Sequence, residues 1–177
     1  MPNSQRGWLS RPHSLPRSLH PWLSDKGSLT RRLKSRCAAF RVVLLSTGLK
    51  RPNVDETALL EMAPGARAYV REVLLLCDEV PVVFAHSVLP YPSLRGAWNG
   101  ISRLGSRPLG EALFSDRRIH RQPLSFRNLH PDHPLFHSLA QQHPPGVNQV
   151  WARRSLFCLN SHPLLVTEVF LPTIVAL

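Results

Sequence analysis

Alternating apolar and polar positions along the chain predict two β-hairpins. Residues 66–77 (ARAYVREVLLLC) and 80–88 (VPVVFAHSV) are rich in apolar and β-branched side chains, and only Asp78 and Glu79 separate them. Two such runs joined by a short polar turn are typical of an antiparallel hairpin. A second hairpin of this kind is expected from residues 149–159 and 164–171 around a tight turn at 160–163, and further strands are expected at 40–45 and within 117–128.

A helical period follows Ser28, which is a favourable N-cap. Leu29, Leu33 and Cys37 then share one face, so a short basic helix is expected over residues 29–37. Prolines cluster in the first 21 residues and between Pro123 and Pro145. Because proline interrupts helices and sheet ladders, these stretches predict loops. Other helical segments are expected at 55–61, 93–103 and 108–114, and irregular structure is expected at 1–20 and 129–147.

The order of these elements predicts the fold class. Strands outnumber helices and follow one another as hairpins, which favours an α+β fold with a single antiparallel sheet and helices packed on one side. A doubly wound nucleotide-binding fold is disfavoured, since the sequence has no glycine-rich phosphate loop. With 177 residues, 43% of them apolar, the chain can bury one core. We expect an irregular N-terminal segment at 1–20 and one domain over 21–177.

The charge is strongly basic and allows three interpretations. The formal net charge is +11, and 19 of the 22 basic residues are arginine. Such a surplus is compatible with binding of nucleic-acid phosphates, with a pocket for an anionic small molecule, or with an ordinary solvated surface. Basic residues are grouped only in pairs such as Arg31–Arg32 and Arg117–Arg118. Without a compact basic run, nucleic-acid binding is the least favoured of the three.

The cysteines and the N-terminus point to the cytoplasm. Cys37, Cys77 and Cys158 are odd in number and lie in apolar segments, which is typical of reduced core thiols. No segment approaches the ~20 apolar residues of a membrane span. The basic N-terminus lacks the apolar stretch of a secretory signal, and its prolines would interrupt the helix of a transit peptide.

Two predicted strands carry a charged residue where the pattern favours an apolar one. Arg71 alternates with Tyr69 and Val73 on one strand face, while Glu168 is the only ionisable residue of the segment 164–171. A buried charge must be paired or hydrogen-bonded. One hypothesis is an Arg71–Glu168 salt bridge or a strand edge open to water. The other is a polar pair at the bottom of an apolar ligand pocket.

Other candidate sites receive little support. His133 and His137 have a metal-ligand spacing, but Pro134 lies between them in a segment that reads as a loop, without a nearby Cys or Glu. A polar surface loop is the simpler interpretation, and no metal is expected. The sequence lacks the G-x-S-x-G nucleophile-elbow motif of serine hydrolases. Cys77 and Cys158 lie in apolar strands and are interpreted as packing residues rather than nucleophiles.

Five segments together resemble the chorismate pyruvate-lyase family, also called the 4-hydroxybenzoate synthase family. They occur in the family's order and span most of residues 22–172. The segments are 22–33 (WLSDKGSLTRRL), 69–76 (YVREVLLL), 104–114 (LGSRPLGEALF), 150–157 (VWARRSLF) and 163–172 (PLLVTEVFLP).

The resemblance implies a fold and an activity. The family has one antiparallel sheet of about six strands with helices on one side and flaps over a buried ligand. Its members convert chorismate to 4-hydroxybenzoate and pyruvate in a first step toward ubiquinone. Because the reaction forms an aromatic ring, we expect neither a metal nor an organic cofactor. A desolvated pocket that fits an aromatic acid should also bind the product, so product inhibition is expected. We expect a monomer whose partners are chorismate and 4-hydroxybenzoate.

The resemblance also implies roles for individual residues. It marks Leu29, Arg71, Leu109 and Glu168 as substrate-binding, with Arg71 and Glu168 as the catalytic pair. Arg71 is expected to hold the ring carboxylate, and Glu168 to face the hydroxyl that becomes the phenol. The leucines are expected to wall the ring. Arg153 or Arg154 is a candidate for the second carboxylate on the basis of charge and location.

Two alternatives remain at this stage. Related sheets serve as effector-sensing domains of bacterial regulators, so the domain could bind an aromatic acid without turnover. Such regulators usually carry a helix-turn-helix domain, for which residues 1–24 are too short and too rich in proline. The second alternative, nucleic-acid binding, rests only on charge. Residues 129–147 are longer and richer in histidine and proline than the family pattern requires.

Overall fold

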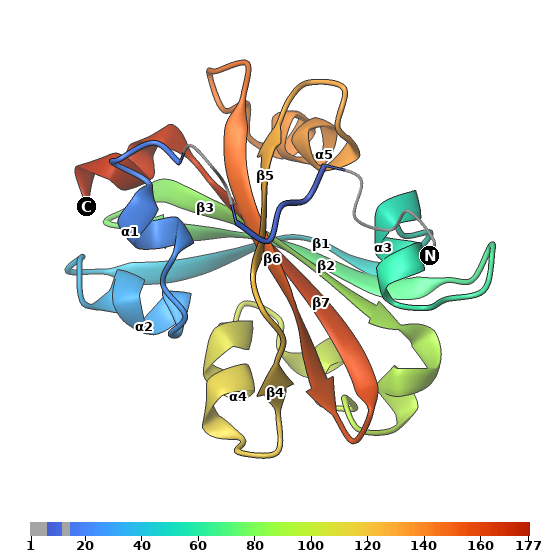
Figure 1. Ribbon diagram of the computed structural model, residues 1–177. Coiled ribbons are helices and arrows are strands. Elements are labelled where there is room, and N and C mark those ends of the chain that lie inside the picture. The colour runs from blue at the N-terminus through green and yellow to red at the C-terminus, as the bar shows by residue number, and fades with distance from the viewer. Residues whose placement is uncertain (1–6, 12–14) are drawn as a thin grey trace.

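The computed structural model describes residues 7–11 and 15–177, and this part of the chain forms one seven-stranded antiparallel sheet (Figure 1). The strand order is β1-β2-β3-β7-β6-β4, and β5 also pairs with β6. The prediction of a single antiparallel sheet is therefore confirmed, with the short β4 raising the number above six. The strands are β1 (Phe40–Lys50), β2 (Ala68–Cys77), β3 (Val80–Pro90), β4 (His120–Arg121), β5 (Ser125–Leu129), β6 (Val150–Leu159) and β7 (His162–Phe170).

Both predicted hairpins are confirmed, as β2–β3 and β6–β7. Their two-residue turns place Asp78 and Glu79 at φ 49° and 65°, and Asn160 and Ser161 at φ 49° and 64°. Positive φ at both central residues matches the right-handed twist of the flanking strands, and Asp and Asn tolerate this conformation better than most residues. The second turn is tighter than the expected span 160–163, because β7 already begins at His162.

The helices differ from the predictions at two places. The expected helix at 93–103 is replaced by two 3₁₀ turns, Tyr91–Arg95 and Ile101–Arg103. The expected loop at 129–147 contains an α-helix, α5 (Pro134–Gln142). Proline is tolerated in the first turn of a helix, so Pro134 begins α5 instead of preventing it. The other helices are α1 (His20–Leu23), α2 (Leu29–Lys34), α3 (Val54–Leu59), α4 (Leu109–Ser115) and the 3₁₀ turn Pro172–Ala176.

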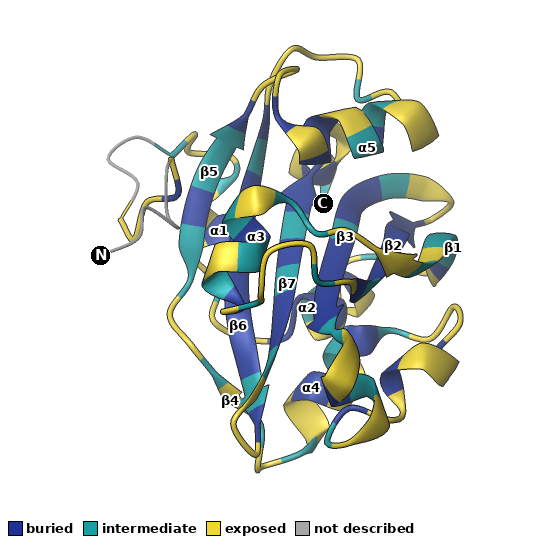
Figure 2. Cartoon of the chain, turned by 90° about the vertical axis from the view of Figure 1, so that its right-hand side faces the viewer, coloured by how far each residue is buried: buried dark blue, intermediate teal, exposed yellow. Residues whose placement is uncertain are grey.

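The sheet is covered on both faces. We call the face that carries Arg71 and Val73 the front face, and the face that carries Glu72 and Leu74 the back face. Helices α1, α2 and α4 pack on the front face. Helices α3 and α5 pack on the back face, so the expectation that the helices lie on one side of the sheet is wrong. Most strand residues are therefore buried, whereas the helices keep exposed outer surfaces (Figure 2).

The segment that precedes α1 also contacts the sheet. Trp8 is buried against the back face, and Leu9 forms an antiparallel bridge with Phe126 in β5.

All three cysteines are free, and the Sγ atoms of Cys37 and Cys77 lie 2.6 Å apart. No helix within the described residues is both long and apolar enough to cross a membrane.

Candidate active site

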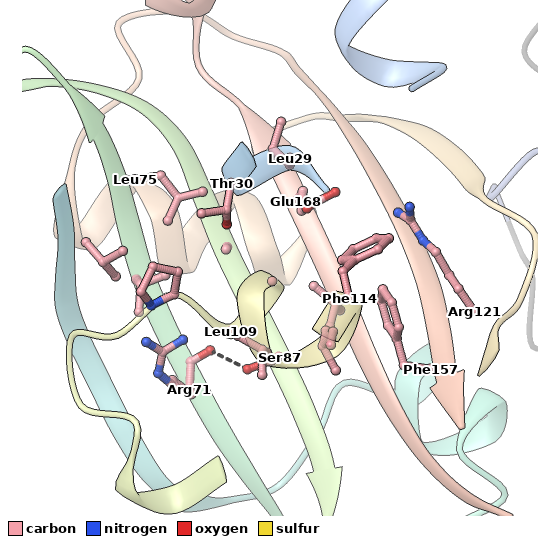
Figure 3. A pocket seen from close by; sticks show the side chains of 17 residues that line it. Leu29, Thr30, Arg71, Leu75, Ser87, Leu109, Phe114, Arg121, Phe157 and Glu168 are labelled. Carbon is pink, nitrogen blue, oxygen red and sulfur yellow. Dashed lines mark hydrogen bonds between the residues drawn. The ribbon is translucent and has the colours of Figure 1, made fainter. Parts of the chain in front are cut away.

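A small cavity lies on the front face, between the sheet and helices α2 and α4 (Figure 3). The space open to the centre of a water molecule is about 50 Å³. Its wall is mainly apolar, with a few polar side chains. Such a combination is typical of a site that binds a small organic ligand and orients it by a few polar contacts. The lining includes Leu29, Thr30, Val73, Leu75, Ser87, Leu109, Phe114, Phe157 and Val166, together with Arg71, Arg121 and Glu168.

The structure brings the four residues singled out from the sequence to this one cavity. Leu29 and Leu109 are the first residues of α2 and α4. Ser28 caps α2 as predicted, since its side chain accepts a hydrogen bond from the backbone N–H of Arg31. Arg71 and Glu168 come from β2 and β7, with β3 between these two strands. They face the same cavity from different strands because alternate residues of paired strands share a face.

Arg71 is buried but forms no ion pair with an acidic side chain of the described residues. Its Nη2 donates hydrogen bonds of 2.8 Å and 2.9 Å to the carbonyl oxygens of Gly105 and Arg107. Its Nε is buried and makes no hydrogen bond with any residue that the structure describes. Burial lowers the pKa of Arg71, but an arginine that starts near 12.5 remains charged at neutral pH. The cavity therefore contains an unneutralised cation with an unused donor, which favours an anionic ligand.

Glu168 is paired with Arg153, which contradicts the hypothesis of an Arg71–Glu168 salt bridge. Arg153 Nε donates a 2.5 Å hydrogen bond to Glu168 Oε2. The pair forms because the two residues are direct partners in the β6–β7 register. Glu168 Oε1 has no hydrogen-bond partner among the described residues and lies beside the cavity. The protein thus fixes one carboxylate oxygen of Glu168, and no described residue donates a hydrogen bond to the other.

Neither Arg153 nor Arg154 lines the cavity, so the expectation that one of them receives a second carboxylate is wrong. Arg153 is fully buried, and its Nη1 donates to the carbonyl oxygens of Trp22 and Asp25 at 2.8 Å and 2.6 Å. These bonds anchor the segment that leads into α2. Arg154 points to the back face, where it pairs with Asp55 at 2.6 Å and stacks on an aromatic ring.

Helices α2 and α4 meet over the cavity. A Cβ atom added at Gly110 in α4 would lie 2.8 Å from Thr30 Oγ1 in α2, so only glycine permits this close approach. An ion pair between the exposed side chains of Lys34 and Glu111 also joins the two helices. Exposed ion pairs of this kind contribute little stability. The contact between α2 and α4 therefore covers part of this small cavity.

Several cavity residues were not singled out from the sequence. Thr30, Phe114 and Phe157 resemble ordinary core residues in their local pattern, and Ser87 lies in a strand without any special motif. Arg121 is one of 19 arginines, and nothing local distinguishes it from the others. Only the packing of β4 beside α4 reveals its position. These residues share no sequence spacing, so the three-dimensional structure was needed to find them.

The histidines of the 129–147 segment have structural positions. His133 is buried and caps α5, since its Nδ1 accepts a 3.2 Å hydrogen bond from the backbone N–H of Leu135. Burial lowers the pKa of His133, which favours the neutral form that can accept this bond. His137 is exposed. Among residues 7–11 and 15–177, no group of three His, Cys, Asp or Glu side chains is arranged to hold a metal ion.

Solved structures with a similar fold are effector domains of transcriptional regulators. The C-terminal domain of PhnF matches with a TM-score of 0.58 at 12% identity, covering 74% of this chain and 82% of that chain. The effector domain of PhnF from Mycobacterium smegmatis matches with a TM-score of 0.56 at 16% identity, covering 83% and 90%. At such low identity these similarities show the fold alone.

Relatives found by sequence are more similar to this chain, and their names agree with one another. A chain from Thiobacillus denitrificans is 52% identical over 96% of this chain and 91% of its own length. Chains from Aromatoleum aromaticum and Nitrosomonas europaea are 50% and 47% identical, covering 96% and 97% of this chain and 94% and 97% of their own lengths. Each relative is named "Probable chorismate pyruvate-lyase". A family model described as Chorismate lyase matches residues 5–176. The chain therefore belongs to the chorismate lyase family.

Proposed function

We propose that this protein is a chorismate pyruvate-lyase that converts chorismate to 4-hydroxybenzoate and pyruvate. The proposal rests on Arg71, a buried guanidinium in a mainly apolar cavity. Among the residues that the structure describes, Arg71 has no acidic partner, and its Nε donor is unused. An aromatic or cyclohexadiene carboxylate supplies both the negative charge and the flat apolar ring that such a cavity requires. The family membership supplies the identity of the acid.

The reaction needs positioning more than chemical assistance. The ether bond between C3 of the ring and the enolpyruvyl oxygen breaks, and its electron pair leaves with that oxygen. The hydrogen on C4 is lost as a proton, and the C–H electron pair completes the aromatic ring. Pyruvate forms when the departing enolpyruvate gains a proton on its methylene carbon. Because aromatisation drives these steps, we propose that neither a metal nor an organic cofactor takes part.

In this proposal Arg71 and Glu168 hold opposite ends of the ring. Arg71 binds the ring carboxylate through charge-assisted hydrogen bonds. Glu168 accepts a hydrogen bond from the hydroxyl on C4 at its free Oε1, while Arg153 holds Oε2 in place. Leu29 and Leu109 close over the ring and exclude water. Fixing both ends of the substrate converts binding energy into correct orientation of the breaking bonds.

The closed cavity also has a consequence for product release. The product retains the ring carboxylate and the hydroxyl, so it keeps both proposed anchors. We therefore propose that 4-hydroxybenzoate dissociates slowly and inhibits the enzyme, since α2 and α4 must separate before it leaves. We further propose that the protein acts in the cytoplasm and that its product is used for ubiquinone synthesis, as the family resemblance implies.

A second candidate function follows from the fold. The solved structures that this chain resembles are effector-binding domains, so the cavity could bind an aromatic acid as a signal without turning it over. The two functions share Arg71 as the carboxylate anchor and differ only in turnover. Product formation from chorismate separates them.

The test is a turnover assay with matched variants. Purified protein is mixed with chorismate and a metal chelator, and 4-hydroxybenzoate is followed by its ultraviolet absorbance. We expect product from the wild type and a loss of about 100-fold in kcat/KM for Arg71→Ala and for Glu168→Ala, because each removes a charge-assisted contact. Arg41→Ala serves as control, since Arg41 is an exposed arginine that pairs with Glu79. If folded wild type gives no product but binds 4-hydroxybenzoate, the effector function replaces this proposal.

A further inference from the structure

Arg121 occupies a position that no family motif marks. It lies in the two-residue strand β4 and lines the cavity beyond Phe114 and Phe157, on the Glu168 side (Figure 3). Its guanidinium carbon is 5.6 Å from the centre of the Phe114 ring and 5.3 Å from that of Phe157. Two aromatic rings therefore hold the cation in place.

The hydrogen bonds of Arg121 leave one end of the guanidinium unused. Its Nε donates a 2.8 Å bond to Ser155 Oγ, and its Nη1 donates a 3.0 Å bond to the carbonyl oxygen of Lys26. No carboxylate of the described residues forms an ion pair with Arg121, and its Nη2 makes no hydrogen bond with any of them. Burial lowers the pKa of Arg121, while the nearby Glu168 carboxylate raises it. The side chain is thus a second fixed cation without an anion of its own.

Arg121 also connects the cavity with the surface. It lines an outer groove together with Lys26, His20 and Leu124, as well as lining the buried cavity. The two arginines of β6 near Glu168 do not line the cavity: Arg153 pairs with Glu168 itself, and Arg154 pairs with Asp55 on the back face. Arg121 is therefore a cation that lines both the outer groove and the Glu168 end of the cavity.

We infer that Arg121 binds the enolpyruvyl carboxylate of chorismate, an inference that rests on the proposed function and names a further binding residue for it. Chorismate carries two carboxylates, and the ring carboxylate on C1 is assigned to Arg71. The enolpyruvyl ether on C3 is next to the C4 hydroxyl, which is assigned to Glu168. The second carboxylate thus lies at the Glu168 end of the cavity, where the Arg121 side chain lines the wall.

Under this inference, Arg121 distinguishes the substrate from the product 4-hydroxybenzoate. The product 4-hydroxybenzoate has only the ring carboxylate, so it cannot contact Arg121 in this way. Arg121 therefore contributes affinity to chorismate and orients the ether that breaks, but it contributes nothing to the retention of 4-hydroxybenzoate. After cleavage, the carboxylate on Arg121 belongs to pyruvate, which can leave through the outer groove that the same side chain lines.

The experiment compares a monoacid and a diacid. Binding of 4-hydroxybenzoate and of 3-(carboxymethoxy)-4-hydroxybenzoate, a stable mimic with a second carboxylate beside the hydroxyl, is measured by calorimetry. We expect the diacid to bind the wild type about 10- to 100-fold more tightly, because it gains one charge-assisted contact. Arg121→Gln should remove this preference while leaving the affinity for 4-hydroxybenzoate within about twofold, whereas Arg71→Ala should weaken both ligands.

Control variants separate a binding role from a structural one. Arg118→Gln removes an exposed arginine of the same segment, and the preference for the diacid should persist. Arg121→Lys keeps the charge but loses the planar guanidinium with its paired N–H donors. This variant should therefore retain part of the preference for the diacid. Equal affinity of wild type for the two acids, or an equal loss of both on Arg121→Gln, would overturn the inference. Turnover tests the lyase function separately, because the binding comparison has a result even if chorismate is not cleaved.

Discussion

Arg153 holds Glu168 across the β6–β7 pair, and the same guanidinium donates to backbone carbonyls of the segment before α2. A fully buried side chain thereby links the sheet, the proposed hydroxyl anchor and the segment that leads into α2. Glu168 is paired with Arg153 and not with Arg71. Arg71 therefore keeps its charge available for a ligand carboxylate in the proposed function.

Arg153→Met should destabilise the protein strongly. Removing one partner of a buried ion pair leaves the other charge uncompensated, and the cost is about 3–5 kcal/mol. The free energy of unfolding, measured with urea, gives the value. Arg41→Met is the control, since its exposed pair with Glu79 should contribute no more than about 1 kcal/mol. Equal effects of the two substitutions would show that the Arg153–Glu168 contact has no special weight.

Gly110→Ala should loosen the contact between α2 and α4 over the cavity. The added Cβ would meet Thr30 Oγ1 at 2.8 Å, so α4 and α2 must move apart. We expect faster dissociation and about 10-fold weaker binding of 4-hydroxybenzoate, measured by stopped-flow fluorescence of the bound ligand. Gly100→Ala is a matched control, because its added Cβ would have no neighbour within 4 Å. Unchanged release in Gly110→Ala would mean that the ligand enters by another route.

A cluster of ionisable side chains on the back face should make the stability of the protein depend on pH. The ring of His86 is buried between Glu56 and Glu72, with its nitrogens 3.1 Å from an oxygen of each. The contact with Glu56 has the distance of an ion pair, although its alignment is outside hydrogen-bond geometry. Glu72 also accepts hydrogen bonds from Ser46 and Ser138 and lies 3.3 Å from Lys50 Nζ. The cluster joins α3, α5 and three strands.

Burial lowers the pKa of His86, but the two carboxylates outweigh it and raise the pKa from 6.5 to about 9. A raised pKa stabilises the fold fully below pH 6.5 and ceases to do so as the pH rises through 9. The free energy of unfolding should therefore fall by roughly 3 kcal/mol over this range. At the acidic side, the lowered pKa values of Glu56 and Glu72 give stability that is lost below pH 4.5.

Urea unfolding at a series of pH values measures this dependence. His86→Gln should be less stable at neutral pH, because it removes the cation between two buried carboxylates and leaves Glu72 with the partly exposed Lys50. The variant should also lack the alkaline decline. An identical decline in wild type and variant would assign the pH dependence to other groups.

The hairpins could be predicted from the sequence because they depend on local alternation. Alternation also singled out Arg71 and Glu168, and the family resemblance then implied that they bind the substrate. Arg71 and Glu168 interrupt apolar strands, and a buried charge in such a position needs a partner, either within the protein or in a ligand. The partner of Glu168 could not be predicted, since Arg153 and Glu168 are matched only by the β6–β7 register. Arg121 was missed for a related reason, because its surroundings come from α4, β4 and β6.

The segment 129–147 shows the limit of composition as a guide. Its prolines predicted a loop, yet Pro134 sits at the start of α5, where a missing N–H has no cost. The apolar residues Leu135, Phe136 and Leu139 have helical spacing and pack on the back face. Here a periodic pattern of a few apolar residues was more informative than the frequency of helix-breaking residues.

The central claim is tested most directly by a single-turnover experiment. Enzyme in excess is mixed with chorismate in the presence of a chelator, and pyruvate and 4-hydroxybenzoate are both quantified after quenching. The account predicts one pyruvate and one 4-hydroxybenzoate for each chorismate with the wild type, and unchanged chorismate with Arg71→Ala on the same timescale. Recovery of intact chorismate from folded wild-type protein would contradict it.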